Sequence, residues 1–321
     1  MISGMKKEAG RNLLGQTLIL LITVAWGSSF IILKHAIENS PALYIIGLRF
    51  SVSGICMAAI FFKKIATIDK TTLLCGLMLG ITLTIAYMTQ TLGLKYISAG
   101  KNAFLTSLYC VVIPFLQWAI FKDKPKSYNV ISAFLCVTGL AFVAFSGTGE
   151  TERNELLGSA LTVVCAVFYA FQIIFSGKYQ ERGCDTLQLL IVQFLTVGVL
   201  TLGVSFIFEL PVYGIESFAI SKSLLLPLSY LTFVCTLLAQ VGQMVGIKLT
   251  SPAQASLILA FEAVFGAIFS IISGDEILNG YLVAGFLIIF AGTMISELKP
   301  NFLKIFRKKP KNNSENPPSD G

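Results

Sequence analysis

Two charged side chains lie inside long apolar runs of the 321-residue sequence, and they have the clearest capacity for chemistry. Glu262 lies near the middle of the run 249–274, within "LAFEAVFGAI". A charge at the centre of a membrane helix costs about 2.5 to 3.5 kcal/mol on insertion scales unless water or a partner relieves it. Glu262 is therefore predicted to face a wet cavity, where its carboxyl group could carry a proton or bind a cation. The alternative is a protonated side chain that hydrogen-bonds to a neighbouring helix.

Arg49 lies in the run 39–62, too deep to be a simple loop charge. It could pair with Glu262 or hold a substrate carboxylate. The alternative is that Arg49 fixes the end or the orientation of its helix, with the long side chain reaching toward the membrane surface.

Other candidates are polar or aromatic side chains in apolar runs. Asn102, Thr106 and Tyr109 recur at i, i+4 and i+7, the spacing of one helical face. This stripe predicts a cavity lining, although interhelical hydrogen bonds or aromatic packing would use the same residue types. No metal-ligand spacing occurs, and no cofactor is expected. The candidate substrate-binding set is Trp26, Arg49, Tyr87, Gln90, Asn102, Thr106, Tyr109, Gln240, Gln243 and Glu262, of which Glu262 is the proton-coupling candidate.

The elements that must position these residues are membrane helices. The chain is 55% hydrophobic and 13% charged, with a mean hydropathy of +0.78, beyond the range of soluble domains. A bilayer core of about 30 Å needs roughly 20 helical residues. The sequence predicts an all-α, polytopic membrane protein of ten transmembrane helices, at approximately 12–33, 39–62, 71–94, 102–121, 127–149, 156–177, 186–208, 223–247, 249–274 and 277–296.

The basic residues predict how these helices are oriented. With a cytoplasmic N-terminus, the cytoplasmic segments hold 18 Lys and Arg residues and the opposite side holds 5. Such a bias places both termini in the cytoplasm, and the plasma membrane is the expected location. The basic tail at 298–321 is expected to be disordered and to touch anionic lipid headgroups. No nucleic-acid recognition module accompanies this tail, so nucleic acid is not an expected partner.

An internal repeat divides the chain. The stretch "QTLGLKYIS" at 90–98 matches "QMVGIKLTS" at 243–251 with an offset of 153, and upstream the offset is 144. At these offsets Tyr109 falls on Glu262, Gly139 on Gly292 and Arg49 on the neutral Gln193. The halves, 12–149 and 154–297, then have five helices each, so the second must enter the membrane from the opposite side. Inverted repeats of this kind predict a carrier that works by alternating access.

Four stretches carry a family resemblance: "AWGSSFIILKHA", "LRFSVSG", "GLKYISAGKNAFLTSLYCVVIPFL" and "SPAQASLILAFEAVFGAIFSIISGDEILNGYLVAGFLIIFAGTMI". Over about residues 15–296 the chain resembles the EamA family of the drug/metabolite transporter superfamily. The resemblance implies a secondary exporter of amino acids, other metabolites or drugs, with a cavity lined by both halves. Many relatives have a proline after the acidic residue of the ninth helix. Here that position is Ala263, so the kink that a proline would give is not carried over to this chain by the resemblance.

Other classes of function are weighed by their motifs. The sequence has no GxxxxGK[ST] phosphate loop and no HExxH zinc helix, and an enzyme is not expected. A gradient-driven uniporter, a pore and a lipid scramblase remain open as alternatives to an exporter. Because two halves can form a complete pathway in one chain, we expect a functional monomer that carries a small-molecule substrate through the lipid bilayer.

Overall fold

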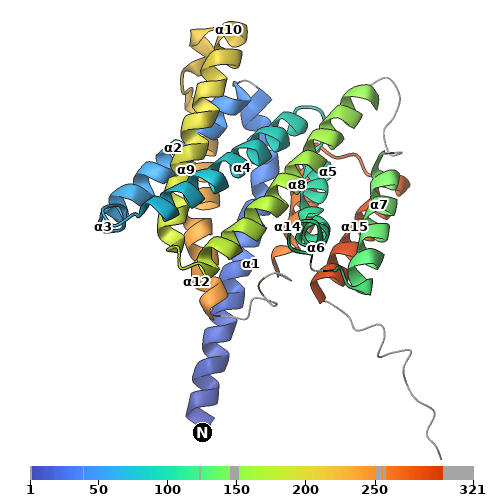
Figure 1. The fold of residues 1–321 in the computed structure, drawn as a ribbon. Helices are drawn as coiled ribbons and strands as arrows, with labels where there is room; N and C mark the ends of the chain where they lie inside the picture. Colours follow the sequence, from blue (N-terminus) through green and yellow to red (C-terminus); the bar gives the residue numbers. More distant parts are fainter. Residues whose placement is uncertain are drawn as a thin grey trace, which may run out of the picture.

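The computed structural model describes residues 2–38, 40–122, 124–144, 152–249, 255 and 258–298. These residues form a bundle of helices and contain no β-strand, which confirms the all-α prediction (Figure 1). The α-helices are α1 (Ile2–Glu38), α2 (Ala42–Ile60), α3 (Phe62–Ile65), α4 (Lys70–Leu94), α5 (Ala99–Ser107), α6 (Tyr109–Phe121), α7 (Ser127–Ala144), α8 (Glu152–Glu181), α9 (Thr186–Val204), α10 (Leu210–Tyr213), α11 (Lys222–Ser229), α12 (Ala239–Leu249), α14 (Glu262–Ile272) and α15 (Gly280–Leu298). Two π-helical segments, η1 (Ser205–Glu209) and η3 (Tyr230–Leu238), and the 3-10 helix η2 (Ile215–Phe218) complete them.

Within the described ranges, seven helical segments are long and apolar enough to cross a membrane. They are Gly10–Glu38, Ala42–Ile60, Lys70–Leu94, Ala99–Phe121, Asn154–Glu181, Thr186–Tyr213 and Lys222–Gln243. Shorter apolar helices cover Ser127–Val143, Glu262–Ile272 and Gly280–Ser296. Many large apolar side chains on their outer faces are exposed, such as Val199, Phe208 and Leu287. Outward apolar faces of this kind suit contact with lipid.

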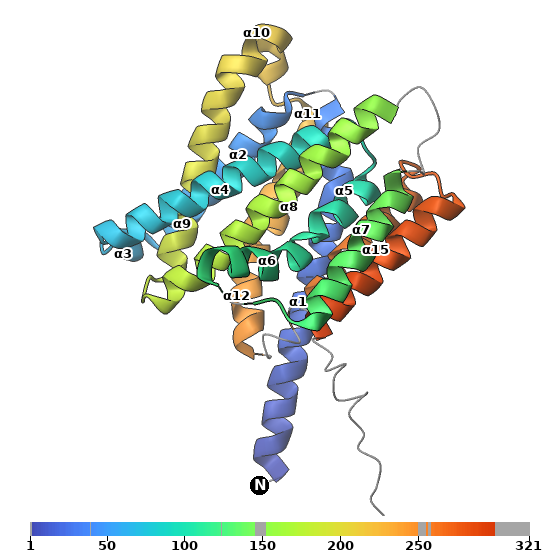
Figure 2. The same cartoon turned by 45° about the vertical axis from the view of Figure 1, so that its right-hand side comes forward.

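The first helix is longer than the predicted run 12–33. α1 spans Ile2–Glu38 because a helix can carry charged residues, here Arg11 and Lys34, where it leaves the apolar layer. The start of α1 and the end of α15 lie at one end of the bundle, called here the proximal end (Figures 1 and 2). α10 and the start of α8 lie at the opposite end, called here the distal end (Figure 1).

Helices far apart in the sequence pack in pairs. α7 lies along α15 (Figure 2). α2 packs along α9, and α5 packs against α14. α4 packs against α8 and α9, and α1 packs against α12 and α14. Nearly every pair joins one helix from before residue 150 to one from after it, so the core lies between the two parts of the chain.

Glycines set the close approach of α7 and α15. A Cβ on Gly139 would lie 2.7 Å from Ile289 Cγ1 and 2.9 Å from the Gly285 carbonyl. Likewise, a Cβ on Gly292 would lie 2.6 Å from Cys136 Sγ, and 3.0 Å from the carbonyl of Ser132. These neighbours are themselves 153 positions apart, as are the two glycines. The two helices therefore meet through equivalent residues.

Two further glycine contacts are equivalent to each other. One joins α4 to α8, and the other joins α12 to α1. Gly93 and Gly158 approach so closely that a Cβ on either would lie 2.8 to 2.9 Å from the other's carbonyl. Gly15 and Gly246 face each other in the same manner, at 3.0 to 3.4 Å. The small-xxx-small pattern "GQMVG" thus marks a close helix contact, as this pattern does in membrane proteins generally.

Candidate functional site

Two helices of the bundle are interrupted at equivalent positions. The predicted run 102–121 is not a single helix: α5 ends at Ser107 and α6 begins after Leu108. α14 likewise begins after Phe261. At each break the amide donates to the carbonyl three residues earlier, Leu108 N to Leu105 O at 3.3 Å and Phe261 N to Ile258 O at 3.1 Å. This is the tighter 3-10 pattern that often marks a hinge or a functional position within a helix.

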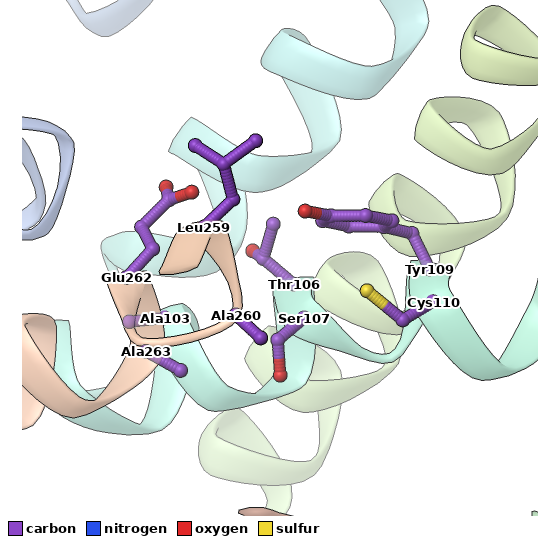
Figure 3. Close-up of a pocket in the computed structure, with 9 residues that line it drawn as sticks. All are labelled: Ala103, Thr106, Ser107, Tyr109, Cys110, Leu259, Ala260, Glu262 and Ala263. Carbon is purple, nitrogen blue, oxygen red and sulfur yellow. The ribbon is translucent and has the colours of Figure 1, made fainter. Parts of the chain in front are cut away.

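A small cavity lies beside the two breaks (Figure 3). Its volume is about 10 Å³, enough for roughly one water molecule. Residues from both parts of the chain line it: Ala103, Thr106, Ser107, Tyr109 and Cys110 from α5 and α6, and Leu259, Ala260, Glu262 and Ala263 at the start of α14. Ala263 does not prevent the interruption, so the helix breaks here without the proline that many relatives have.

Glu262 is half-buried at this cavity. Within the described part of the chain it accepts no hydrogen bond, and none of the ion pairs found there includes it. In Figure 3 the side chain of Leu259 lies between the Glu262 carboxylate and the Tyr109 ring. Glu262 thus lies at a cavity, and its role there stays a prediction. A carboxyl group without a partner among the described residues is open to a proton, a cation or water.

Arg49 lies apart from this cavity, between α2 and η3. The residue is buried, with 3% of its surface exposed, and its Nε donates a short hydrogen bond to Thr236 Oγ1. Its guanidinium carbon lies 5.5 Å from the ring centres of both Phe50 and Tyr87. None of the ion pairs among the described residues joins Arg49 to Glu262. The contacts agree with the alternative role of fixing helices, and substrate binding by Arg49 stays a prediction.

The polar residues Gln90, Asn102 and Thr106 join helices. Gln90 Nε2 donates to Thr106 Oγ1 at 3.1 Å, and Asn102 Nδ2 donates to the Gln90 carbonyl at 3.1 Å and to Thr162 Oγ1 at 2.9 Å. Asn102 is fully buried and does not line the cavity beside Glu262. The predicted stripe is therefore divided: Asn102 links α4, α5 and α8, whereas Thr106 and Tyr109 reach the cavity.

Tyr169 of α8 belongs to this region, although the sequence reading did not single it out. Its ring lies 5.6 Å from that of Tyr87 and 6.3 Å from that of Tyr109. The contacts of Gly15 and Gly158 imply an offset of 143 between α1 and α8, at which Trp26 aligns with Tyr169. The offset of 144 predicted from the sequence aligns Trp26 with Ala170 instead. This difference of one residue is why the equivalence of Trp26 and Tyr169 is not visible in the sequence alone.

The remaining candidates lie outside the cavity lining. Trp26 Nε1 donates to the Cys235 carbonyl at 2.7 Å and so joins α1 to η3. Gln240 and Gln243 are half-buried on α12. The structure thus brings Thr106, Tyr109 and Glu262 to one cavity, and it places the other candidates in the helix contacts around it.

A second cavity, of about 370 Å³, lies at the proximal end. A proline shapes its wall: Pro114 has no N–H for the carbonyl of Cys110, which instead accepts from Ser296 Oγ at 3.3 Å. Cys110 lines both cavities, so the two lie on either side of this residue. The polar residues Gln117, Asn129 and Ser296 of its wall escaped prediction, since isolated polar residues near helix ends carry little signal. The lining is Cys110, Ile113, Pro114, Gln117, Lys124, Pro125, Lys126, Tyr128, Asn129 and Ser296.

Comparison with known proteins identifies the family. The EamA-like transporter family matches the chain twice, over residues 13–145 and 156–298. The chain is 26% identical over 300 residues to an "Uncharacterized transporter" of Archaeoglobus fulgidus, covering 92% of this chain and 91% of that relative. It is 27% identical over 294 residues to a "Probable amino-acid metabolite efflux pump" of Salmonella typhimurium, covering 87% and 93%.

A solved crystal structure has the same fold, with a TM-score of 0.63 at 17% identity, over 92% of this chain and 99% of the other. The family determines the class of activity: transport of small molecules across a lipid bilayer, and not catalysis. The apolar helices of the bundle agree with a chain that passes the membrane several times. The chain therefore belongs to the EamA-like transporter family of the drug/metabolite transporter superfamily, and it is a multi-pass membrane transporter.

Proposed function

We propose that the chain is a secondary carrier that exports small metabolites, or drugs, from the cytoplasm by alternating access. In this proposal it crosses the plasma membrane ten times, keeps both termini in the cytoplasm and works as a monomer. The seven long apolar segments and the three shorter apolar helices together correspond to the ten predicted runs. The relative from Salmonella typhimurium, named a probable amino-acid metabolite efflux pump, makes amino acids and their derivatives the first substrates to test.

The inverted repeat on which alternating access depends is supported by equivalent contacts. The approach of Gly93 to Gly158 has a counterpart in the approach of Gly246 to Gly15. The packing of α4 on α8 similarly corresponds to that of α12 on α1. The family also matches the chain once in each half. A molecule whose halves make equivalent contacts can exchange their conformations, and so move an opening from one side to the other.

The observation that carries the proposal is the pair of interrupted helices beside one cavity. In transporters built from inverted repeats, interruptions at corresponding positions of the two halves mark the substrate site. Here α6 and α14 begin at equivalent residues, and both contribute to the lining around Glu262. A cavity with room for about one water molecule corresponds to a closed site, which must widen to admit a substrate.

Glu262 is the proposed coupling group. Its carboxyl group has no hydrogen-bond or ion-pair partner within the described residues, so a proton or the ammonium group of a substrate can occupy it in turn. Competition between these two cations for one carboxylate would couple export of the substrate to entry of a proton.

Flux measurements on purified protein in liposomes test this role. With an imposed pH gradient, the wild-type chain should accumulate a radiolabelled amino acid against its concentration gradient, and Glu262→Gln should lose this accumulation. Glu38→Gln is the matched control, because Glu38 is exposed at the end of α1 and should leave flux unchanged. Coupled flux of wild-type size in Glu262→Gln would remove the proton-carrier role.

The same assay separates the rival activities. A uniporter would equilibrate the substrate without any ion gradient and would gain nothing from a pH difference. A pore would show neither saturation nor counterflow of labelled against unlabelled substrate, and a scramblase would move labelled lipid. Saturable counterflow that responds to pH is the result expected for the proposed carrier.

A further inference from the structure

Charged side chains tie the two halves of the chain together at the distal end. Lys34, near the end of α1, pairs with Asp275 in the segment between α14 and α15, with 2.6 Å between Nζ and Oδ1. Lys101 of α5 pairs with Glu155 of α8 at 3.3 Å. Each ion pair joins a residue of 12–149 to a residue of 154–297. All four side chains are at least two-thirds buried, which shields their attraction from solvent.

Asp275 is the centre of these contacts. While Oδ1 pairs with Lys34, Oδ2 accepts from the amide of Ala99 at 2.7 Å and from Ser270 Oγ at 3.1 Å. Ala99 is the first residue of α5, so the carboxylate also meets the positive end of that helix. The neighbouring Glu276 is buried as well and accepts a short hydrogen bond from Ser98 Oγ.

Gly100 makes room for this arrangement. A Cβ at Gly100 would lie 2.7 Å from Glu276 Oε2 and 3.3 Å from Ala267 Cα, so a larger residue would push α5 away from α14. We call the group the distal clasp: Lys34, Ser98, Ala99, Gly100, Lys101, Glu155, Ser270, Asp275 and Glu276.

The face of α14 next to the clasp is closed. A Cβ on Gly266 would lie 2.5 Å from the Cβ of Ala103, and Ala267 and Ser270 pack on Gly100. The equivalent face of α6, 153 positions earlier, carries Ile113, Pro114 and Gln117, and these three residues line the proximal cavity. The same face of two equivalent helices is therefore packed shut at the distal end and hollow at the proximal end.

No equivalent clasp is formed by the counterpart of Lys34. At the offset of 143 between α1 and α8 this counterpart is Gly177, which has no side chain to form an ion pair. The next residue, Lys178, pairs with Glu181 of its own helix at 3.0 Å. That pair joins no two helices. It therefore does not join the two halves at the proximal end. Lys64 and Asp185 do join α3 to the start of α9, but their side chains are 46% and 34% exposed, so solvent screens their attraction more than that of the distal pairs. The ionic contacts thus favour the conformation that is closed at the distal end.

We propose that the distal clasp is the external gate of the carrier, which holds the state open toward the cytoplasm and must break each time the substrate leaves. The inference rests on the proposed function for its direction, and it adds the residues that open and close the pathway. Weakening the clasp shifts the population toward the outward-open state, since a two-state equilibrium follows the difference in free energy between its states.

Hydrogen–deuterium exchange of the full chain in lipid nanodiscs, without substrate, tests the gate. Asp275→Asn keeps one acceptor oxygen, which can serve both Ala99 and Ser270, but removes the charge that attracts Lys34. Lys34→Gln removes the other charge. In both variants we expect about tenfold faster exchange of the distal amides at 98–102 and 270–276, the size of effect of one charge-assisted hydrogen bond. At the same time the proximal amides at 110–122 should exchange more slowly, because that end closes when the distal end opens.

Control variants make the result decisive. Lys222→Gln removes an exposed lysine at the start of α11, and it should change neither end. Lys34→Arg keeps the charge and should resemble the wild-type chain. Faster distal exchange without slower proximal exchange would mean local loosening and would overturn the gate, as would wild-type exchange in both variants. If one variant does not fold, the other decides. The exchange experiment uses no substrate, so its result does not depend on transport. Faster distal and slower proximal exchange in a chain that carries no substrate would reject the proposed function but still support the gate.

Discussion

Tyr109 and Glu262, 153 positions apart in the sequence, are each the first residue of a helix that follows a break, and both line one cavity (Figure 3). The backbone around them is alike, with the same 3-10 turn before each residue. Their chemistry differs, since one is a phenol and the other a carboxylic acid. The two halves place these residues alike, and the difference between the two side chains gives the described lining of the cavity its one carboxyl group.

Arg49 should matter for stability. Replacing it with Gln removes the hydrogen bond to Thr236 and the contact with two aromatic rings, at an expected cost of about 2 kcal/mol of unfolding free energy. Arg182→Gln makes the same change at an exposed position and should cost under about 0.5 kcal/mol. Unfolding in detergent, followed by circular dichroism, measures both. Equal stability of the two variants would argue against a structural role and leave substrate binding as the reason for a buried arginine.

Gly139→Ala and Gly177→Ala should have opposite effects. At Gly139 the new Cβ would meet Ile289 and a carbonyl of α15 at 2.7 to 2.9 Å, and such overpacking costs about 1 to 3 kcal/mol. At Gly177, near the end of α8, nothing lies within 4 Å. There the alanine should stabilise the helix by about 0.5 to 1 kcal/mol. Melting temperatures that move in the same direction for both variants would contradict the close packing of α7 on α15.

Pro114 and Ser296 should be coupled through the carbonyl of Cys110. In the wild-type chain Ser296→Ala removes the hydrogen bond to this carbonyl, which costs about 1 kcal/mol. In a Pro114→Ala background the new amide can bond to the same carbonyl along the helix, so the added cost of Ser296→Ala should fall close to zero. A double-mutant cycle on unfolding free energies measures this difference. Additive effects would show that Pro114 does not create the site for Ser296.

The contacts of Asp185 predict that the folded protein becomes less stable in acid. It caps α9 through the amides of Leu187 and Gln188 and pairs with Lys64 at 2.5 Å. Burial raises the pKa of Asp185, but the hydrogen bonds from Lys64 and from these amides outweigh it and lower the pKa from its usual value of 3.8. A lowered pKa in the folded state stabilises the fold above the unfolded value, and this stabilisation is lost as the pH falls through the folded pKa.

Asp185→Asn keeps an acceptor for the two amides and removes the charge. Its melting temperature should lie below that of the wild-type chain at pH 7, and the difference should shrink toward pH 3. Lys64→Gln removes the partner in the ion pair and should behave similarly. A gap between wild type and Asp185→Asn that stays constant over this range would rule out the charge as the source of stability.

The helices could be predicted from hydropathy because each apolar run must bury its backbone in its own hydrogen bonds. The breaks could not. The stretch around Leu108 has no glycine and no proline, whereas α6 continues through Pro114, a residue type that removes a helix hydrogen bond. The helix before the break, α5, packs on α14, and contacts between such distant parts of the chain leave no local pattern in the sequence.

The ion pairs at the distal end could not be predicted either, because they too join distant parts of the chain. Lys34 and Asp275 are separated by most of the chain, and each alone resembles an ordinary charge at the end of a membrane helix. The cavity was partly predictable: Glu262 stood out by its cost in an apolar run, and Tyr109 was found as its counterpart in the repeat. Asn102 shares their helical periodicity, but its side chain bonds to Gln90 of α4 and Thr162 of α8 and does not line the cavity.

The contact between α7 and α15 has a consequence for the origin of such chains. Gly139 contacts Ile289 and Gly285, and Gly292 contacts Cys136 and Ser132. The two helices therefore contact each other through equivalent surfaces. Interfaces with this property are isologous, the type that forms between two identical subunits. A five-helix polypeptide with this surface could pair with an upside-down copy of itself, and gene fusion would then have joined two subunits that already fitted.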